Sequence, residues 1–379
     1  MTMRFDNTLY CHVGEVYPWE KLVDELREQI QFSDQAGFTG VWMAEHHFSW
    51  DGWYRAAPNP ILLGTSLAQY SDRLRFGQCG TVIPDWHPIR VAEDIALMDQ
   101  LTKGRVDFGI ARGIDTRPSA QFNRYADRRN QESNYALFAE SLDVIIGAWT
   151  QESFMHSGRF YNFPVPGWKE TNPLVYDSRY HASDGELIAL GVHPKPYQKP
   201  HPPIWQMADS KASHEFAGRR GIGVLCQSIS IGRIKEAWTA HNRALTEAQG
   251  REVPFGEKLA VVRPTYVAET YEQAVKDVSW GSKQLGAWYS HNPVKVYKAM
   301  VTEEELSEDD LNLGWLDFQL KHDLVCVGTP DSVSEQIERL QSEVNCRHMA
   351  LFLNFPGLGL EKLKRSQNLF AEKVMPRFL

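Results

Sequence analysis

Residues 74–113 read LRFGQCGTVIPDWHPIRVAEDIALMDQLTKGRVDFGIARG and contain a strand, a helix and a second strand in succession. The apolar run Leu74–Ile83 predicts the first strand. Pro88 is placed to open an amphipathic helix, and Gly104 is placed to end it. The run Arg105–Ala111 then has its apolar residues on one face, as a strand does. Because a helical crossover returns the chain to the same end of a sheet, the two strands are expected to be parallel.

The same alternation extends over the whole chain. Eight strand runs are predicted, each followed by helix: Phe5–Cys11, Gly40–Ala44, Leu74–Ile83, Arg105–Ala111, Pro203–Ala208, Ile222–Cys226, Lys258–Ala268 and Arg347–Asn354. Eight such units suit a closed (β/α)8 barrel of the α/β class. A doubly wound open sheet is the alternative, but it would normally carry a glycine-rich phosphate turn after its first strand. That turn reads Cys11-His12-Val13-Gly14-Glu15, without the G-x-G-x-x-G pattern, which favours the barrel.

Two segments interrupt the regular pattern. Gln151–Pro200 is rich in Pro, Gly, His and Tyr and is too long for an ordinary connector, and Gly286–His322 is a second long excursion. No clear linker separates the two halves of the chain. The sequence therefore predicts one barrel domain, residues 1–379, with both segments as insertions near the barrel mouth.

The composition argues against several classes of protein. The 379 residues carry 40 Lys and Arg against 48 Asp and Glu, a net charge of −8 with no long basic run, so we expect no binding to nucleic acid or to anionic membranes. The amino-terminal segment lacks a signal-peptide layout and no apolar stretch approaches the roughly 18 residues of a membrane span, which predicts a cytoplasmic protein. The five cysteines form no C-x-x-C pair, so neither disulfides nor a structural zinc site are expected.

Histidines and small polar residues gather after the predicted strands. In a barrel these positions share one mouth, where chemistry is expected, so the pattern indicates an enzyme. The positions are His12, Glu45-His46-His47, Cys79-Gly80, Asp85-Trp86-His87, Arg112-Gly113, Asp209-Ser210-Lys211, Gln227-Ser228 and Asn354. Adjacent histidines after a strand point in different directions, so we expect no metal ion. Ser210 and Ser213 flank the first turn of a helix and suit either a helix cap or, with Lys211 and Arg112, a phosphate cradle.

Several of these segments resemble one known family. Val41-Trp42-Met43-Ala44-Glu45-His46-His47-Phe48 looks like the block after the second strand of the bacterial luciferase α-subunit. The blocks 87–94, 99–105 and 108–113 look like its third-helix and fourth-strand region, and Val327-Gly328-Thr329-Pro330 and 372–376 match in place. The chain thus resembles the luciferase-like flavin monooxygenases over nearly its whole length, with the likeness fading in the two insertions.

The resemblance implies a (β/α)8 barrel that uses reduced FMN from a separate NAD(P)H-flavin reductase, and O2, to oxygenate an apolar organic substrate through a flavin C4a-peroxide. It implies that His46 is catalytic; an ordinary imidazole, with a pKa near 6.5, accepts or donates a proton at neutral pH. It implies a non-prolyl cis peptide at Cys79-Gly80 behind the flavin ring, and a mobile lid at 286–322. The implied phosphate-binding residues are Arg112, Asp209, Ser210 and Ser213, and those beside the isoalloxazine are Gln227 and Ser228.

This sequence also departs from the luciferase pattern. Ala111 stands in place of a cysteine, Asp209 in place of a glutamate, Lys211 in place of a small residue and Ser228 in place of a tryptophan, so we expect neither light emission nor long-chain aldehydes as substrates. Tryptophans near strand ends suit either an apolar substrate or plain core packing: Trp50, Trp53, Trp86 and Trp288.

Three functions follow from the resemblance. The first is a monooxygenase that oxidises an apolar carbonyl compound, in a Baeyer-Villiger reaction or at an aldehyde, or an aromatic compound. The second is a deazaflavin-dependent dehydrogenase of the same superfamily. The third is a non-catalytic flavin-binding subunit, against which His46 and Arg112 argue. Because members of the family pair through helices 2 and 3, a homodimer is expected.

Overall fold

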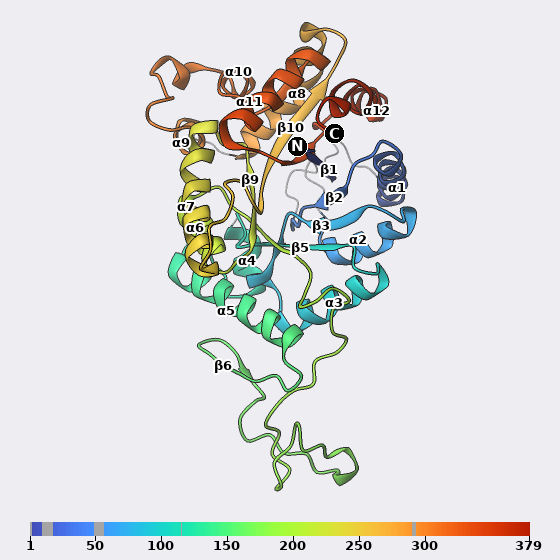
Figure 1. Ribbon diagram of the computed structural model, residues 1–379, viewed down its shortest axis with the longest axis vertical. Helices are drawn as coiled ribbons and strands as arrows, with labels where there is room; N and C mark the ends of the chain where they lie inside the picture. Colours follow the sequence, from blue (N-terminus) through green and yellow to red (C-terminus); the bar gives the residue numbers. More distant parts are fainter. Residues whose placement is uncertain (1, 10–17, 49–56, 115, 290–292) are drawn as a thin grey trace. The chain divides into compact units, whose positions relative to one another are not determined.

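The computed structural model describes residues 2–9, 18–48, 57–114, 116–289 and 293–379 (Figure 1). His12, Trp50 and Trp53 lie outside these residues, as does the side chain of Trp288. The chain divides into a larger unit, residues 1–80 and 204–379, and a smaller unit, residues 81–203.

The larger unit holds most of the barrel strands. Its parallel strands pair in the order β3-β2-β1-β12-β10-β9-β8, and the short β11 pairs with the carboxyl half of β10. Their bounds are β1 Arg4–Leu9, β2 Gly40–Met43, β3 Arg75–Gln78, β8 Ile204–Met207, β9 Gly223–Gln227, β10 Leu259–Val267, β11 Cys326–Gly328 and β12 His348–Phe352. With β5 of the smaller unit, every predicted strand run is present, and the predicted (β/α)8 barrel is confirmed.

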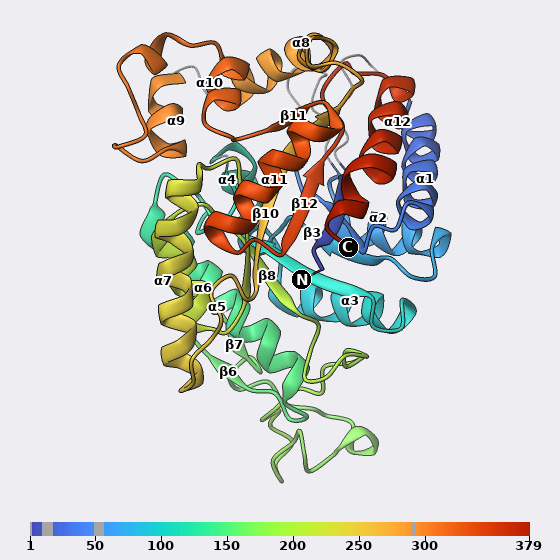
Figure 2. The ribbon, with the colours of Figure 1, turned by 45° about the horizontal axis from the view of Figure 1, so that its top comes forward.

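Helices follow the strands of the larger unit. They are α1 Trp19–Gln35, α2 Pro60–Leu67, α6 Lys211–Arg219, α7 Ile231–Gln249, α8 Tyr271–Tyr289, α9 Pro293–Met300, α10 Trp315–Lys321, α11 Pro330–Val344 and α12 Leu360–Leu369. The first and last of these, α1 and α12, lie side by side (Figure 2), and Lys364 pairs with Glu28 across them at 2.7 Å. No helix in the described part of the chain is long and apolar enough to cross a membrane.

The smaller unit contains β4 Thr81–Val82, β5 Val106–Ala111, α3 Pro88–Leu101, α4 Thr116–Phe122 and α5 Gln131–Thr150. Strands β4 and β5 are parallel, with Thr81 opposite Ile110. The predicted run Leu74–Ile83 is therefore split into β3 and β4. The interruption is the Cys79–Gly80 peptide, which is cis, as the resemblance predicted.

The first insertion, 151–200, extends beyond α3 and α5 and contains the two-residue strands β6 His156–Ser157 and β7 Asn162–Phe163 (Figure 1). Its last part lies at the amino end of β5, where the side chain of Gln198 donates to Val106 O at 2.9 Å. The hairpin of β6 and β7 is the part of this insertion that lies near the carboxyl end of β4. Its Tyr161 and Phe163 contact His87, with ring centroids 5.9 and 5.6 Å from the imidazole.

The second insertion, 286–322, contains α9 and α10 and lies at the carboxyl end of β9. Ser230, just beyond β9, donates its N–H to Met300 O at 2.8 Å, and Arg233 Nε donates to Val301 O at 2.9 Å. This is the mouth end of the larger unit's strands, as the sequence predicted for this segment.

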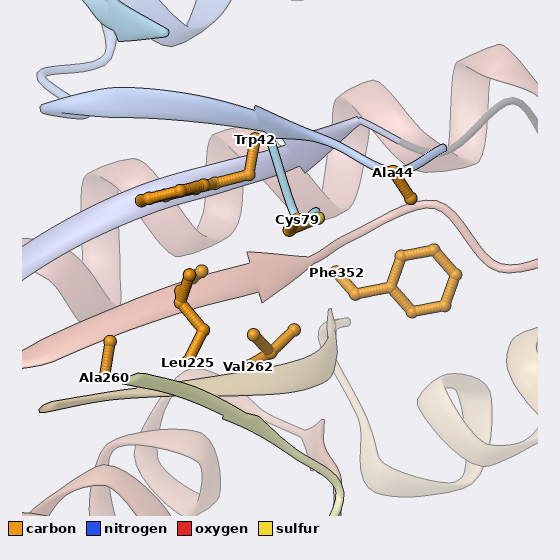
Figure 3. Packing of buried hydrophobic residues seen from close by; sticks show 8 residues of the cluster. Trp42, Ala44, Cys79, Leu225, Ala260, Val262 and Phe352 are labelled. Carbon is orange, nitrogen blue, oxygen red and sulfur yellow. The ribbon is translucent and has the colours of Figure 1, made fainter. Parts of the chain in front are cut away.

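Two tryptophans fill the interior of the larger unit's strands. The buried cluster contains Trp42, Cys79, Leu225, Val262 and Phe352 (Figure 3), and Trp205 packs against it. The rings of Trp42 and Trp205 meet edge to face at 6.1 Å. Glycine makes room for both, because a Cβ at Gly77 would lie 2.3 Å from Trp42 and one at Gly223 would lie 2.6 Å from Trp205.

Gly77→Ala is therefore expected to lower the free energy of unfolding by about 1–3 kcal/mol, the usual cost of an overpacked core. Trp42 cannot move aside easily, because it is buried and its Nε1 donates to Asp6 at 2.7 Å. Urea denaturation measures the change. Gly314→Ala is the control, since that glycine is exposed and its nearest neighbour is the flexible Asp317 carboxylate at 3.1 Å. Equal stability of the wild type and Gly77→Ala would contradict this packing.

Candidate functional site

His46 and His47 follow β2, and their imidazoles have different surroundings. The imidazole of His47 lies 2.8 Å from the buried Glu45 carboxylate, so it packs on its own strand-end neighbour. Burial, with a smaller effect from His47, lowers the pKa of His46 to about 3. The ordinary pKa assumed from the sequence is thus wrong for this site, because the surrounding protein disfavours the imidazolium. At neutral pH, His46 is a neutral hydrogen-bonding group and a weak base.

Asp209 and Gln227 are brought together at the carboxyl ends of β8 and β9. The N–H of Gln227 donates to Asp209 Oδ1 at 2.6 Å. Asp209 keeps solvent-accessible surface, yet the protein around it raises its pKa to about 6, an effect that the Gln227 hydrogen bond and the charge of Arg263 reduce. The carboxylate therefore joins two neighbouring strand ends, and the protein around it favours its protonated form.

Ser210 and Ser213 lie at the amino terminus of α6. Ser210 is the N-cap, its Oγ accepting from Ser213 N at 3.3 Å, and the two hydroxyl oxygens are 2.9 Å apart. Both interpretations left open by the sequence are compatible with this geometry, because the cap leaves Ser210 exposed and Ser213 half-buried. Hydroxyls at a helix amino terminus, where the helix dipole is positive, are a favourable receptor for a phosphate.

Ser228 directly follows β9 and has a left-handed backbone conformation, with a φ of 52°. It is buried, and its N–H donates to Val262 O at 3.4 Å. One residue further on, Ile229 O accepts a hydrogen bond from Arg263 Nη2 at 2.6 Å. Arg263 was not foreseen as part of this region. The only sequence signal is a lone charged residue within the apolar run of β10.

Cys79 faces the interior of the larger unit, near Ala44 and Phe352 (Figure 3). Its N–H donates to Met43 O at 2.8 Å, which joins the end of β3 to the end of β2. The four described cysteines are buried. Within the described residues, no group of three or more His, Cys, Asp or Glu side chains is arranged to hold a metal ion.

Arg112 follows β5 in the smaller unit and has a second arginine beside it. Its guanidinium lies over the ring of Tyr135 at 5.4 Å, and its pKa is lowered by burial. The pKa of Arg128 is lowered by burial and by the charge of Arg112, and Arg128 donates to Gly113 O. Among the described residues, no carboxylate pairs with either arginine. Two adjacent cations without an acid suit a bound dianion. Arg128 went unpredicted, its signal being the arginine-rich stretch Arg124–Arg129.

The strand ends of the larger unit carry the hydroxyls of Ser210 and Ser213 and the imidazole of His46, and the smaller unit carries the guanidinium groups of Arg112 and Arg128. Donors of these kinds fit the phosphate and the polar ring edge of a flavin. The family model for luciferase-like monooxygenase matches residues 7–344. The chain belongs to this family of oxidoreductases.

One curated relative and two solved structures are similar to this chain. The oxygenase component of a flavin-dependent trigonelline monooxygenase from Acinetobacter baylyi is 27% identical, with 99% of this chain and 96% of that protein covered. The oxygenating constituent of 3,6-diketocamphane monooxygenase from Pseudomonas putida, solved with FMN, has a TM-score of 0.78 and 21% identity, with 100% of this chain and 99% of that chain covered. An F420-dependent secondary alcohol dehydrogenase has a TM-score of 0.68 and 16% identity, with both chains fully covered. The last two likenesses show the shared fold.

His46 is expected to stay neutral between pH 8 and pH 5. The pKa of His46 in the folded state lies below the unfolded value of 6.5. The free energy of unfolding is therefore expected to decrease as the pH falls from about 6.5 toward 3. NMR titration of the imidazole carbons measures this directly, with His46→Gln identifying the signal. The same variant should show a weaker loss of stability between pH 6.5 and pH 4. A midpoint near 6.5 for His46 in the folded protein would refute the assignment.

Proposed function

We propose that this chain is the oxygenase of a two-component system that takes reduced FMN from a separate NAD(P)H-flavin reductase and uses O2 to oxygenate an apolar carbonyl or aromatic compound. The carrying observation is the position of His46 directly after β2, where burial lowers the pKa of its imidazole, in a chain that belongs to a monooxygenase family. The whole-length likeness to a trigonelline monooxygenase's oxygenase component supports the need for a reductase. When bound, reduced FMN would supply the electrons that activate O2.

The side chains have separate tasks in this proposal. Arg112, with Arg128 beside it, balances the charge of the FMN phosphate, and Ser210 and Ser213 donate hydrogen bonds to that phosphate. Asp209 fixes the N–H of Gln227 at 2.6 Å and so sets the backbone before Ser228, which lies beside the ring. His46, uncharged, orients the reacting oxygen by hydrogen bonding.

Direct oxygenation tests the proposal. The protein, FMN, NADH and a generic flavin reductase are incubated under 18O2 with ketones, aldehydes and phenols, and the products are read by mass spectrometry. Incorporation of one labelled oxygen atom is the expected result. Turnover only with an oxidised deazaflavin as the hydride acceptor, without oxygen uptake, would instead identify a dehydrogenase. Flavin binding without turnover of any substrate would indicate a binding subunit.

Two further expectations are tested separately. Light scattering tests the expected homodimer, and cell fractionation tests the expected cytoplasmic location.

Arg112→Ala is expected to weaken FMN binding by about ten- to a hundredfold, since one charge-assisted hydrogen bond contributes roughly 1.5–3 kcal/mol. Riboflavin, which has no phosphate, should lose much less. Quenching of flavin fluorescence measures both affinities, and Arg128→Ala should behave in the same way. Arg129→Ala is the matched control, because Arg129 is exposed and pairs with Asp127 at 2.5 Å. Equal losses for FMN and riboflavin would place the phosphate elsewhere.

His46→Asn is expected to slow product formation by about ten- to a hundredfold, because one hydrogen bond to a charged oxygen is lost. Flavin affinity should stay within a few-fold, and consumed O2 should appear as hydrogen peroxide. His47→Gln should have a smaller effect, since glutamine can still donate to Glu45. Product and peroxide per NADH are the measured quantities. A near-normal product yield in His46→Asn would remove His46 from the mechanism, and His87 would be tested next.

A further inference from the structure

The loop between β9 and α7, residues 228–230, is held from two sides. From β10, Arg263 Nη2 donates a hydrogen bond to Ile229 O at 2.6 Å. From the second insertion, Glu305 accepts hydrogen bonds from the Ser230 hydroxyl and, at 3.0 Å, from Gly232 N. The loop that carries Ser228 is therefore fastened both to the barrel and to a segment far away in the sequence.

The carboxylate of Glu305 makes the second of these attachments. Besides Ser230 and Gly232, it accepts the N–H of Thr302 at 2.8 Å, so one side chain joins the insertion to the amino terminus of α7. Burial alone would raise the pKa of Glu305, but the hydrogen bonds from Ser230, Thr302 and Gly232 outweigh it and lower the pKa. The group is thus ionised at neutral pH, where charge-assisted hydrogen bonds are strongest.

Gly232 allows this close approach. A Cβ at that position would lie 2.7 Å from Glu305 Oε1, closer than side chains tolerate. The carboxylate also lies at the first turn of α7, where a negative charge is favoured by the helix dipole. The Ser230 N–H also donates to Met300 O at 2.8 Å. These contacts join residues 230–232 to residues 300–305, and we call this set of contacts the junction.

We propose that Glu305 is a positioning residue: its carboxylate couples the second insertion to the loop after β9 and thereby holds Gln227 and Ser228 in place for the flavin. Ser228 lies only two residues before Ser230 and has a left-handed backbone, with a φ of 52°, so a displaced Ser230 displaces it too. The assignment of Gln227 and Ser228 to the flavin rests on the proposed function. The junction itself does not.

Asp310 provides a matched control in the same insertion. It is also a buried carboxylate whose hydrogen bonds and ion pairs lower its pKa against the effect of burial. Its partners lie within the insertion: Ser307 N at 2.8 Å, His322 at 3.3 Å and Lys321. Asp310→Asn therefore perturbs the insertion without touching the loop after β9, whereas Glu305→Gln perturbs the junction.

Hydrogen exchange tests the junction without any cofactor. Glu305→Gln keeps the side-chain size but removes the charge and turns one acceptor into a donor. Exchange at the N–H groups of Ser230, Gly232 and Thr302 is expected to accelerate about ten- to a hundredfold. Asp310→Asn should accelerate exchange at Ser307 and leave Ser230 and Gly232 unchanged. Unchanged exchange at Ser230 and Gly232 in Glu305→Gln would overturn the junction.

Turnover tests the positioning role. With reductase and NADH, Glu305→Gln is expected to raise the Kd for FMN and lower product per NADH, each severalfold, and Glu305→Asp should recover part of both. Asp310→Asn should change neither by more than twofold. Faster exchange with unchanged FMN affinity and coupling would overturn the positioning role. A wild type that binds no flavin would contradict the proposed function and with it this role, while the exchange data would still decide whether Glu305 fixes the loop.

Discussion

The buried carboxylate of Asp6 is the interaction on which the larger unit's strands depend. It accepts from Trp42 Nε1 at 2.7 Å, lies 2.7 Å from His348 Nε2 and pairs with Arg4 at 2.8 Å, which ties β1 to β2 and β12. Burial alone would raise the pKa of Asp6, but Arg4 and His348 outweigh that effect and hold it well below its usual range. Breaking such a set is costly, because a buried charge then stays uncompensated. The tryptophan held by Asp6 in turn fills the space left by Gly77.

The sequence predicted the strands well because each is an apolar run bounded by turn residues, and such runs have few alternatives once a helix follows. It missed β6, β7 and β11, which have only two or three residues and so no measurable periodicity. It also missed α4, whose seven residues contain a proline and no apolar stripe. Such short elements form because neighbouring parts of the fold hold them in place. These contacts involve residues far apart in the sequence, so a local pattern does not predict them.

For the candidate site, the sequence predicted residue types at strand ends but not their environment. The pairing of Asp209 with the N–H of Gln227 joins two positions named in advance. The neutral state of His46 could not be foreseen, because it depends on how much protein surrounds the ring. Arg263 could not be foreseen either, since nothing in an apolar run tells which backbone carbonyl a buried guanidinium will reach.

Carboxylates near the two ends of the larger unit's strands have pKa values shifted in opposite directions. Near the amino ends of these strands, Asp6 has a full set of donors and a lowered pKa, so its charge contributes to stability. At the carboxyl end of β8, Asp209 has a raised pKa, and after β2 the imidazole of His46 is kept neutral. Polar groups that are already fixed in place bind a ligand more strongly than the same groups in water, because the cost of orienting them has been met in folding. The amino ends of these strands therefore hold a charge that contributes to stability, whereas the carboxyl ends hold groups whose ionised forms the protein disfavours.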